Sequence, residues 1–265
     1  MSDAAGPSPP SPSAAVGRLA AALKGAARAL KDGALPPRCA GCGVVVATEG
    51  VLCPTCWTEV SFLEEPLCVQ CGYPFELDFG EPVKCGACLA RPPAFDRARA
   101  VFAYDAASKS MLLSFKHGDR TDLAPTLAVW MARSGAALLA DADVIAPVPL
   151  HPKRLWRRRY NQSGLLAQRL ARSSGRPALV DLLQRTRDTP SQGGFSAKGR
   201  ERNVAGAFAV RPARRPAIQG ARVLLVDDVY TTGATAEACA KALKRAGASA
   251  VDLLALARVV RPGAG

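Results

Sequence analysis

The sequence contains no apolar run long enough to cross a membrane. In its 265 residues, a charged residue, a proline or a glycine interrupts every hydrophobic stretch well short of the roughly 18 residues that a spanning helix requires. The N-terminus also lacks the basic residues and hydrophobic run of an export signal, since it carries Asp3 and a tract of proline, serine and alanine. We therefore expect a cytoplasmic protein with no membrane partner.

Histidine is scarce as well. The chain has two, His117 and His151, and histidine is the side chain that most often serves as a general base near neutral pH. Neither stands out in that role, although His151 lies nearer in sequence to the loops described below.

Acidic residues are fewer than basic ones, and they are unevenly placed. The chain has 22 acidic residues against 35 lysines and arginines, which gives a net charge of +13. Residues 39–88, however, hold seven acids and the single base Lys84. A polyanion would therefore meet the other parts of the chain first, which argues against nucleic-acid binding by residues 39–88.

The cysteines are arranged in a way that does not suit a secreted disulfide scaffold. Eight of the nine form four pairs with two residues between the members, which is the spacing of metal knuckles in a reducing compartment. Two tetrahedral zinc sites of four thiolates each would use all eight. The ligands would be Cys39, Cys42, Cys53, Cys56, Cys68, Cys71, Cys85 and Cys88.

We expect the first four of these cysteines to bind one ion and the last four the other, although the spacing also permits a cross-braced arrangement. Because four sulfur ligands leave no coordination position open, the zinc is expected to be structural. A redox role is the alternative for a CxxC pair, but four regularly spaced pairs are unlike a lone redox motif. The ninth cysteine, Cys239, falls on the apolar face of the last helix and is expected to be a buried core residue.

The chain is organised around residues 222–247. An apolar run at 223–226 predicts a strand that is buried on both faces, and two carboxylates, Asp227 and Asp228, end it. A turn rich in hydroxyl groups follows, after which alanines and leucine recur at helical spacing. The turn consists of Thr231, Thr232, Gly233, Ala234 and Thr235.

This order of elements suits a phosphorylated sugar. Backbone N–H groups at the helix N-terminus, together with the threonine hydroxyls, form a nest for a phosphate, and Gly233 lets the backbone approach it closely. Asp227 and Asp228 can accept hydrogen bonds from two neighbouring ribose hydroxyls. The alternative is an ordinary strand-to-helix turn with threonine caps. Because every part occurs in order, we favour a ribose 5-phosphate cradle.

A second candidate binding segment follows a core strand expected at residues 143–149. Five bases lie between residues 150 and 159. Next to the cradle they can hold pyrophosphate, but they can also bind a nucleic-acid backbone or form a solvated face. We assign pyrophosphate binding to Pro149, Leu150, His151, Lys153 and Arg154.

Residues 223–235 resemble the phosphoribosyl diphosphate (PRPP) motif of type I phosphoribosyltransferases, in which apolar residues, two acids and a TxGxT loop follow one another. Four further segments narrow the likeness to the ComF competence-protein family, which joins an N-terminal zinc ribbon to a phosphoribosyltransferase domain. These segments are PVPLH at 147–151, RRYNQ at 158–162, SQ at 191–192 and RERNVAGAF at 200–208. The likeness covers residues 39–260, and Arg159 departs from it because many members have glycine there.

The resemblance implies an α/β fold of the type I phosphoribosyltransferase kind, with a mostly parallel sheet flanked by helices and a small N-terminal double zinc ribbon. We expect a disordered or helical basic extension at residues 1–35, with its weak helix at 18–31, the ribbon at 36–92 and the phosphoribosyltransferase-like domain at 93–260. Further strands are expected at 98–104, 180–185, 207–210 and 251–257, and helices at 108–115, 123–139 and 161–173.

The resemblance also implies a reaction. PRPP would bind with Mg²⁺ and pass its phosphoribosyl group to a nitrogen nucleophile with release of pyrophosphate, and Asp227, Asp228 and Arg200 would be the catalytic residues. Residues 186–203 correspond to the mobile loop that closes over PRPP in such enzymes, where Gln192 and Arg202 would contact the ligands; a plain flexible linker is the alternative.

The second interpretation is a non-catalytic role. Since ComF-type proteins are associated with DNA uptake, the chain would bind single-stranded DNA through the phosphates, with two basic runs at residues 153–159 and 211–222. Competence proteins are the other partners that the resemblance implies. Base stacking would need aromatic platforms, and Trp156 and Tyr160 are the aromatic residues in or beside the first run.

Overall fold

The structure is a computed structural model that describes residues 36–48, 50–117, 120–187 and 197–260. The expected N-terminal extension, residues 1–35 with its helix at 18–31, lies outside the described residues. In the part that is described, no helix combines the length and the apolar character needed to cross a bilayer.

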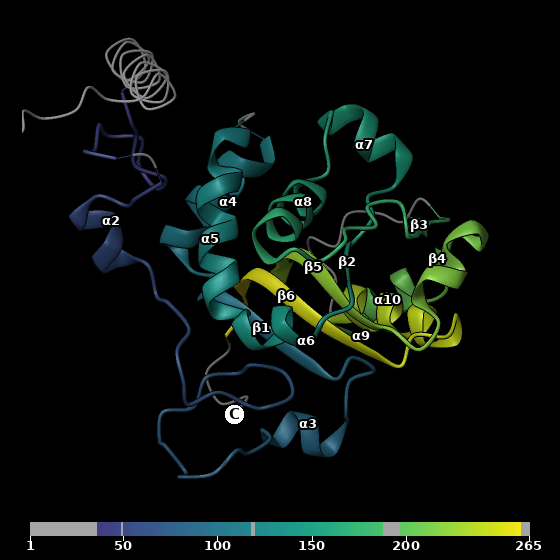
Figure 1. Ribbon diagram of the computed structural model, residues 1–265. Coiled ribbons are helices and arrows are strands. Elements are labelled where there is room, and N and C mark those ends of the chain that lie inside the picture. The colour runs from purple at the N-terminus through teal and green to yellow at the C-terminus, as the bar shows by residue number, and fades with distance from the viewer. Residues whose placement is uncertain (1–35, 49, 118–119, 188–196, 261–265) are drawn as a thin grey trace, which may run out of the picture.

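A parallel sheet of four strands forms the centre of the molecule (Figure 1). The order across the sheet is β1 (Arg97–Ala103), β6 (Ala250–Arg258), β5 (Arg222–Tyr230) and β2 (Val144–Pro147), and each neighbouring pair is parallel. All nine residues of β6 are buried, as expected of a central strand covered on both faces. The expected α/β class with a parallel sheet is confirmed.

Helices cover both faces of the sheet. On one face, α4 (Ala106–His117), α5 (Ala124–Ser134) and α8 (Gln162–Ser174) pack against Leu224 and Val226 of β5. On the other face, α10 (Ala234–Arg245) packs against Val223 and Leu225. The alternation along β5 explains its continuous apolar run, because both faces of the strand need apolar side chains.

The helix expected over residues 123–139 is divided in the structure. A 3₁₀ turn, η1 (Thr121–Leu123), leads into α5, and Gly135 separates α5 from α6 (Ala136–Asp141). A Cβ atom at Gly135 would lie 2.6 Å from Leu254 Cδ2 of the central strand. The chain therefore bends at a glycine that lies against the Leu254 side chain.

Two of the expected strands form a separate antiparallel pair. These are β3 (Leu183–Arg185) and β4 (Phe208–Val210), and they do not join the main sheet. Between them lies α9 (Ala197–Val204), so part of the expected mobile loop is helical. The connection from β4 to β5 contains a 3₁₀ segment, η2 (Pro212–Ile218).

The cysteine-rich segment, residues 36–92, straddles the edge of the sheet at β1. Its short helices are α2 (Pro54–Glu59) and α3 (Gly86–Ala90). Its middle part bonds to the free side of β1: Leu63 N donates to Val101 O at 2.9 Å and Ala98 N donates to Gln70 O at 2.7 Å. The first cysteines pack into the core on one face of the sheet, and the last four pack into the core on the other.

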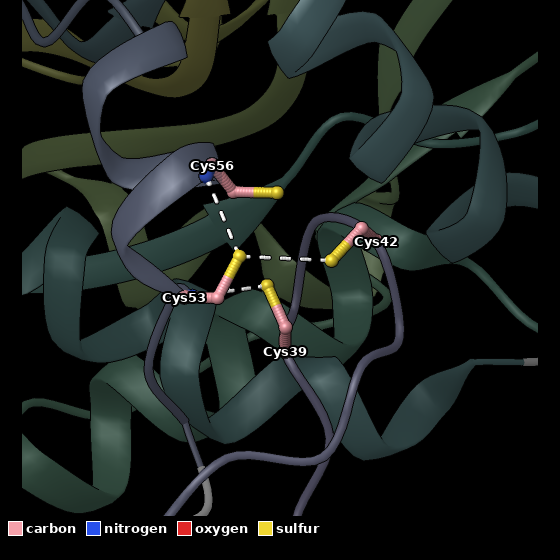
Figure 2. A group of neighbouring side chains, drawn as sticks. All are labelled: Cys39, Cys42, Cys53 and Cys56. Carbon is pink, nitrogen blue, oxygen red and sulfur yellow. Dashed lines mark hydrogen bonds between the residues drawn. The ribbon is translucent and has the colours of Figure 1, made fainter.

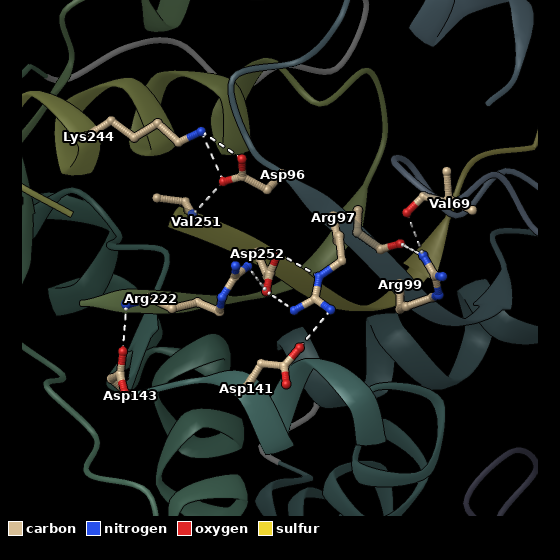
Figure 3. A network of polar contacts seen from close by, with 11 residues as sticks. Val69, Asp96, Arg97, Arg99, Asp141, Asp143, Arg222, Lys244, Val251 and Asp252 are labelled. Carbon is tan, nitrogen blue, oxygen red and sulfur yellow. Dashed lines mark hydrogen bonds and ion pairs between the residues drawn. The ribbon is translucent and has the colours of Figure 1, made fainter. Parts of the chain in front are cut away.

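An ionic cluster around the buried Asp252 joins β1, β6 and β5 near the amino-terminal ends of these strands (Figure 3). Asp252 of β6 is completely buried. It accepts hydrogen bonds from Arg97 Nη2 of β1 at 2.6 Å and from Arg222 Nη1 of β5 at 3.2 Å. Arg97 also pairs with Asp141 of α6 at 2.8 Å. One carboxylate near the start of β6 thus joins the first residues of β1 and β5.

Candidate functional site

The eight paired cysteines form two compact groups. Within each group the four Sγ atoms lie within 4.8 Å of one another. The groups are sequential, residues 39–56 and 68–88, as expected in preference to cross-bracing, and Figure 2 shows the first of them. Tetrahedral zinc with Zn–S bonds of about 2.3 Å needs sulfur atoms roughly 3.8 Å apart. One sulfur pair in each group, Cys42–Cys53 at 3.7 Å and Cys71–Cys85 at 3.6 Å, matches that requirement.

Both groups share one supporting contact. Cys53 N donates to Cys39 Sγ, and Cys85 N donates to Cys68 Sγ, each at 3.2 Å. Such N–H donors stabilise thiolates that bind a metal and fix their orientation. The geometry fits two structural zinc-binding sites with no open coordination position.

A cavity of about 560 Å³ lies where β2 and β5 end. The last pair in the register of these strands is Pro147 with Val226. The strand was expected to end with Asp227 and Asp228, and this was wrong, because β5 continues to Tyr230 and stays paired with β6. Asp227 and Asp228 therefore lie inside β5 but beyond the end of β2, so their side chains line the cavity. The carboxyl ends of parallel strands are where α/β sheets bind ligands.

The two carboxylates have different partners. Asp227 Oδ1 accepts a hydrogen bond from Ser163 Oγ at 3.4 Å and from Asp228 N at 2.9 Å. Asp228 Oδ2 forms an ion pair with Lys116 Nζ at 3.0 Å. Burial, and secondly the Asp228 charge, raise the pKa of Asp227 to about 7. The pair can therefore hold a proton or a cation near neutral pH.

The hydroxyl-rich turn leads from β5 into α10. Gly233 precedes the helix with a φ of +79°, and a Cβ atom there would lie 2.8 Å from the Tyr230 ring, so the position requires glycine. Thr231, Gly233, Ala234 and Thr235 line the cavity. Thr232 instead lines a neighbouring hollow of about 300 Å³, and its buried hydroxyl has no hydrogen-bond partner within the described residues.

The basic segment after β2 is helical rather than an extended loop. It forms α7 (Pro152–Arg158), capped by His151, whose Nδ1 accepts from Lys153 N at 3.4 Å. Of the five residues assigned to pyrophosphate, Pro149, Leu150 and Arg154 line the cavity, whereas His151 and Lys153 lie outside its lining. Arg159 follows the helix with a φ of +64°, which is left-handed backbone that favours glycine.

The structure describes only some of the residues expected in the mobile loop, residues 186–203. The backbone of Arg200 and the exposed Arg202 lie in α9. Gln192 lies outside the described residues. Their assigned roles therefore stay predictions.

Several residues that line the cavity were not predicted from the sequence, among them Lys116, Ser163 and Arg185. Lys116 follows the last apolar residue of α4, and Ser163 comes directly after the YNQ segment that carried the family likeness. A polar residue that ends an apolar helix is the signal that could have identified Lys116. Nothing in the local pattern marks Arg185, which is buried and lies over the Phe208 ring at 5.3 Å.

Known proteins resemble the chain over most of its length. Residues 30–89 match the Double zinc ribbon domain family. The DNA utilization protein YhgH of Salmonella typhi is 37% identical over 201 residues, which are 73% of this chain and 85% of the relative. Competence protein F of Haemophilus influenzae is 33% identical over 227 residues, which are 83% of this chain and 96% of the relative.

A solved structure also matches part of the chain. It is glutamine phosphoribosylpyrophosphate amidotransferase from B. subtilis complexed with ADP and GMP, with a TM-score of 0.35 and 24% identity over 54% of this chain and 30% of that one. The family assignment rests instead on the sequence relatives and on the ribbon that precedes the α/β part. The chain therefore belongs to the ComF family of competence proteins.

Proposed function

We propose that the protein binds PRPP with Mg²⁺ and transfers its phosphoribosyl group to a nitrogen nucleophile, with release of pyrophosphate. One observation carries the proposal: the acid pair Asp227 and Asp228 and the Gly233 turn at the N-terminus of the 12-residue helix α10 border one cavity. Separately, each feature is common; together they match the two ends of a ribose 5-phosphate. A volume of about 560 Å³ is typical of small-molecule sites.

Each part of the cavity has a task in this proposal. The N–H groups of residues 231–235 hold the 5-phosphate, and the hydroxyls of Thr231 and Thr235 assist. Asp227 and Asp228 accept hydrogen bonds from the ribose 2- and 3-hydroxyls. Asp227 and Asp228 would hold Mg²⁺ together with the bound PRPP, and the ion would supply positive charge to the leaving group.

The wall formed by Pro149, Leu150 and Arg154 receives the pyrophosphate. As the bond from C1 to the pyrophosphate oxygen breaks, negative charge grows on the leaving group and positive charge grows on the ribose ring. Arg154, together with Arg200 of α9, stabilises the negative charge on the leaving group. The Asp227 and Asp228 carboxylates stabilise the positive charge on the ribose ring, and the nucleophile then forms its bond to C1.

In this proposal, the segment between β1 and β2 covers the part of the cavity in which the acceptor binds. Tyr104 and Leu113 come from this segment and line the cavity together with the acid pair. They present an aromatic ring and an aliphatic side chain on the side where a planar acceptor base would lie. We further propose a ribbon at residues 36–92 and a phosphoribosyltransferase domain at 93–260, working in the cytoplasm, where a reducing environment preserves zinc thiolates.

A thermal-unfolding experiment tests the binding step. PRPP with Mg²⁺ at about 100 times its Kd should add about 2.7 kcal/mol of stability, and so raise the Tm by roughly 5 °C or more. The variant D227N/D228N should lose this shift, whereas D122N, on the exposed Asp122, should keep it. Equal shifts in all three proteins would contradict the roles of the acid pair. Release of pyrophosphate with a panel of candidate acceptors then tests turnover.

A second candidate function is binding of single-stranded DNA during DNA uptake. It is favoured by Trp156, which is 88% exposed on the basic helix α7, and by the relatives' names. An exposed ring beside cations suits a stacking platform. Affinity for an oligonucleotide should fall steeply with salt and should fall about tenfold in W156A. The variant W57A, at an exposed tryptophan of the acidic ribbon, should bind like the wild type; equal losses in both would contradict this function.

A further inference from the structure

Lys116 places a positive charge at the acid pair. It lies in the last turn of α4 and reaches into the cavity, where its Nζ lies 3.0 Å from Asp228 Oδ2. The two side chains are only 18% and 19% exposed, so the pair is partly desolvated and stronger than a surface ion pair. In this structure Asp228 is therefore occupied by a cation from its own chain.

Two side chains, those of Tyr160 and Gln162, bond to the end of α4 that carries Lys116, and Asn161 between them bonds to the chain after β2. Tyr160 OH donates to Phe115 O at 2.7 Å, and Gln162 Nε2 donates to Lys116 O at 3.1 Å. Between them, Asn161 Nδ2 donates to Val148 O at 3.1 Å. The carbonyls at the end of a helix lack partners within the helix. Tyr160 and Gln162 supply such partners and so hold the backbone from which Lys116 extends.

The same three contacts define the side of the cavity on which Lys116 lies. Val148 directly precedes Pro149 and Leu150, which line the wall after β2 together with Arg154. Asn161 and Gln162 thus join the end of α4 to that wall. The 5-phosphate turn follows β5 and leads into α10, at another border of the cavity. Lys116 therefore lies beside the wall that we assign to pyrophosphate.

Ribose binding would change the surroundings of Lys116. Asp228 cannot direct the same oxygen lone pairs to the ammonium group and to a ribose hydroxyl. A buried ammonium group that loses its carboxylate needs another anion, because burial of an unpaired charge is costly. A pyrophosphate on the adjacent wall provides that anion, and an ammonium group binds phosphate oxygens well.

We propose that Lys116 is a binding residue for the pyrophosphate group of PRPP, and that it passes from Asp228 to the phosphate oxygens as the ribose hydroxyls take its place. Tyr160, Asn161 and Gln162 act as positioning residues for it. The inference rests on the proposed function and adds a requirement: the protein distinguishes ligands that carry the pyrophosphate from ligands that carry only the 5-phosphate.

Calorimetric titration of the full-length, zinc-loaded protein tests this requirement, with PRPP and ribose 5-phosphate as ligands in the presence of Mg²⁺. A charge-assisted hydrogen bond contributes enough for K116M to weaken PRPP binding about 10- to 100-fold. Affinity for ribose 5-phosphate should change less than about threefold, since the turn and the acid pair remain. K116R should recover part of the loss, and K109M, at an exposed lysine of the same helix, should bind both ligands like the wild type.

The positioning role has its own readout. Q162M removes the hydrogen bond to Lys116 O, so it should lower the ratio of PRPP to ribose 5-phosphate affinity in the same direction as K116M but by less. In the double variant K116M/Q162M, the ratio should fall no further than in K116M alone. A merely structural role of Gln162 would change the Tm or both affinities and leave the ratio unchanged.

The possible failures are distinguishable. If the wild type binds neither ligand, the PRPP function itself is wrong and the inference falls with it. If the wild type binds PRPP, and K116M changes both affinities equally or raises both, then Lys116 only neutralises Asp228 and the inference alone is wrong.

Discussion

The guanidinium carbon of Arg258 lies 4.5 Å from the centre of the Tyr230 ring. Arg258 also donates a hydrogen bond to Cys71 O, and its Nη2 lies 3.5 Å from Cys71 Sγ. Tyr230 in turn leaves no room for a side chain at Gly233. One buried arginine thus joins the second four-cysteine group to the turn that borders the cavity.

The variant R258M should weaken zinc binding at the second group. Loss of an outer contact to a metal ligand typically costs about 10- to 100-fold in metal affinity. In a chelator competition assay, one of the two zinc ions should therefore leave the variant much faster than it leaves the wild type. R245M, at an exposed arginine of α10, is the control. Equal release of both ions from R258M would contradict the contact.

The variant D252N should be strongly destabilised. It leaves Arg97 and Arg222 without the buried carboxylate that they share. Breaking a buried ion pair from one side typically costs about 3–5 kcal/mol. Urea unfolding should show this loss in the free energy of unfolding, whereas D122N, which breaks the exposed pair of Asp122 with Arg120, should lose less than about 1 kcal/mol. Similar values for both would show that the cluster contributes little.

The variant R159G should be more stable than the wild type. Left-handed backbone costs a residue with a Cβ atom about 1–2 kcal/mol, and glycine avoids this cost but gives up more freedom on folding. The net gain should be about 0.5–1 kcal/mol in the free energy of unfolding. The same change at Arg169, inside α8, should instead destabilise by about 1 kcal/mol. A loss in R159G would show that its side chain outweighs the backbone strain.

Asp227 should make stability depend on pH. Its pKa is near 3.8 when unperturbed and about 7 in the folded protein. Between these values the folded state retains a proton that the unfolded state has released, so stability falls as pH rises through this window and then levels off. Because Asp227 is only half-buried, we expect a loss of roughly 1–2 kcal/mol.

The matched variant for this pH effect is D227N. Its free energy of unfolding, measured by urea titration from pH 5 to pH 8, should lack the decline. Parallel curves for the wild type and the variant would mean that Asp227 ionises normally. Mg²⁺, which selects the ionised pair, should shift the wild-type decline to lower pH.

The features predicted from sequence are those encoded locally. The CxxC spacing brings two thiolates together within each knuckle, and the run from β5 through Gly233 into α10 depends on neighbouring residues alone. The contacts that complete the cavity join distant segments: Lys116 meets Asp228 across 112 positions of the sequence. The separate pairing of β3 with β4 and the extension of β5 to Tyr230 likewise depend on strand partners, which local patterns do not reveal.

The cysteine-rich segment runs along the outer side of β1, and this position bears on the tendency of the protein to aggregate. A sheet with an unpaired outer strand exposes donors and acceptors to which a strand from another molecule can add. Residues 61–63 and 70 occupy part of that border. Residues 61–63 lie between the two four-cysteine groups in the sequence, and residue 70 lies within the second group. Chains made without enough zinc should therefore tend to precipitate through intermolecular strand addition, and supplying zinc during production should keep them dispersed.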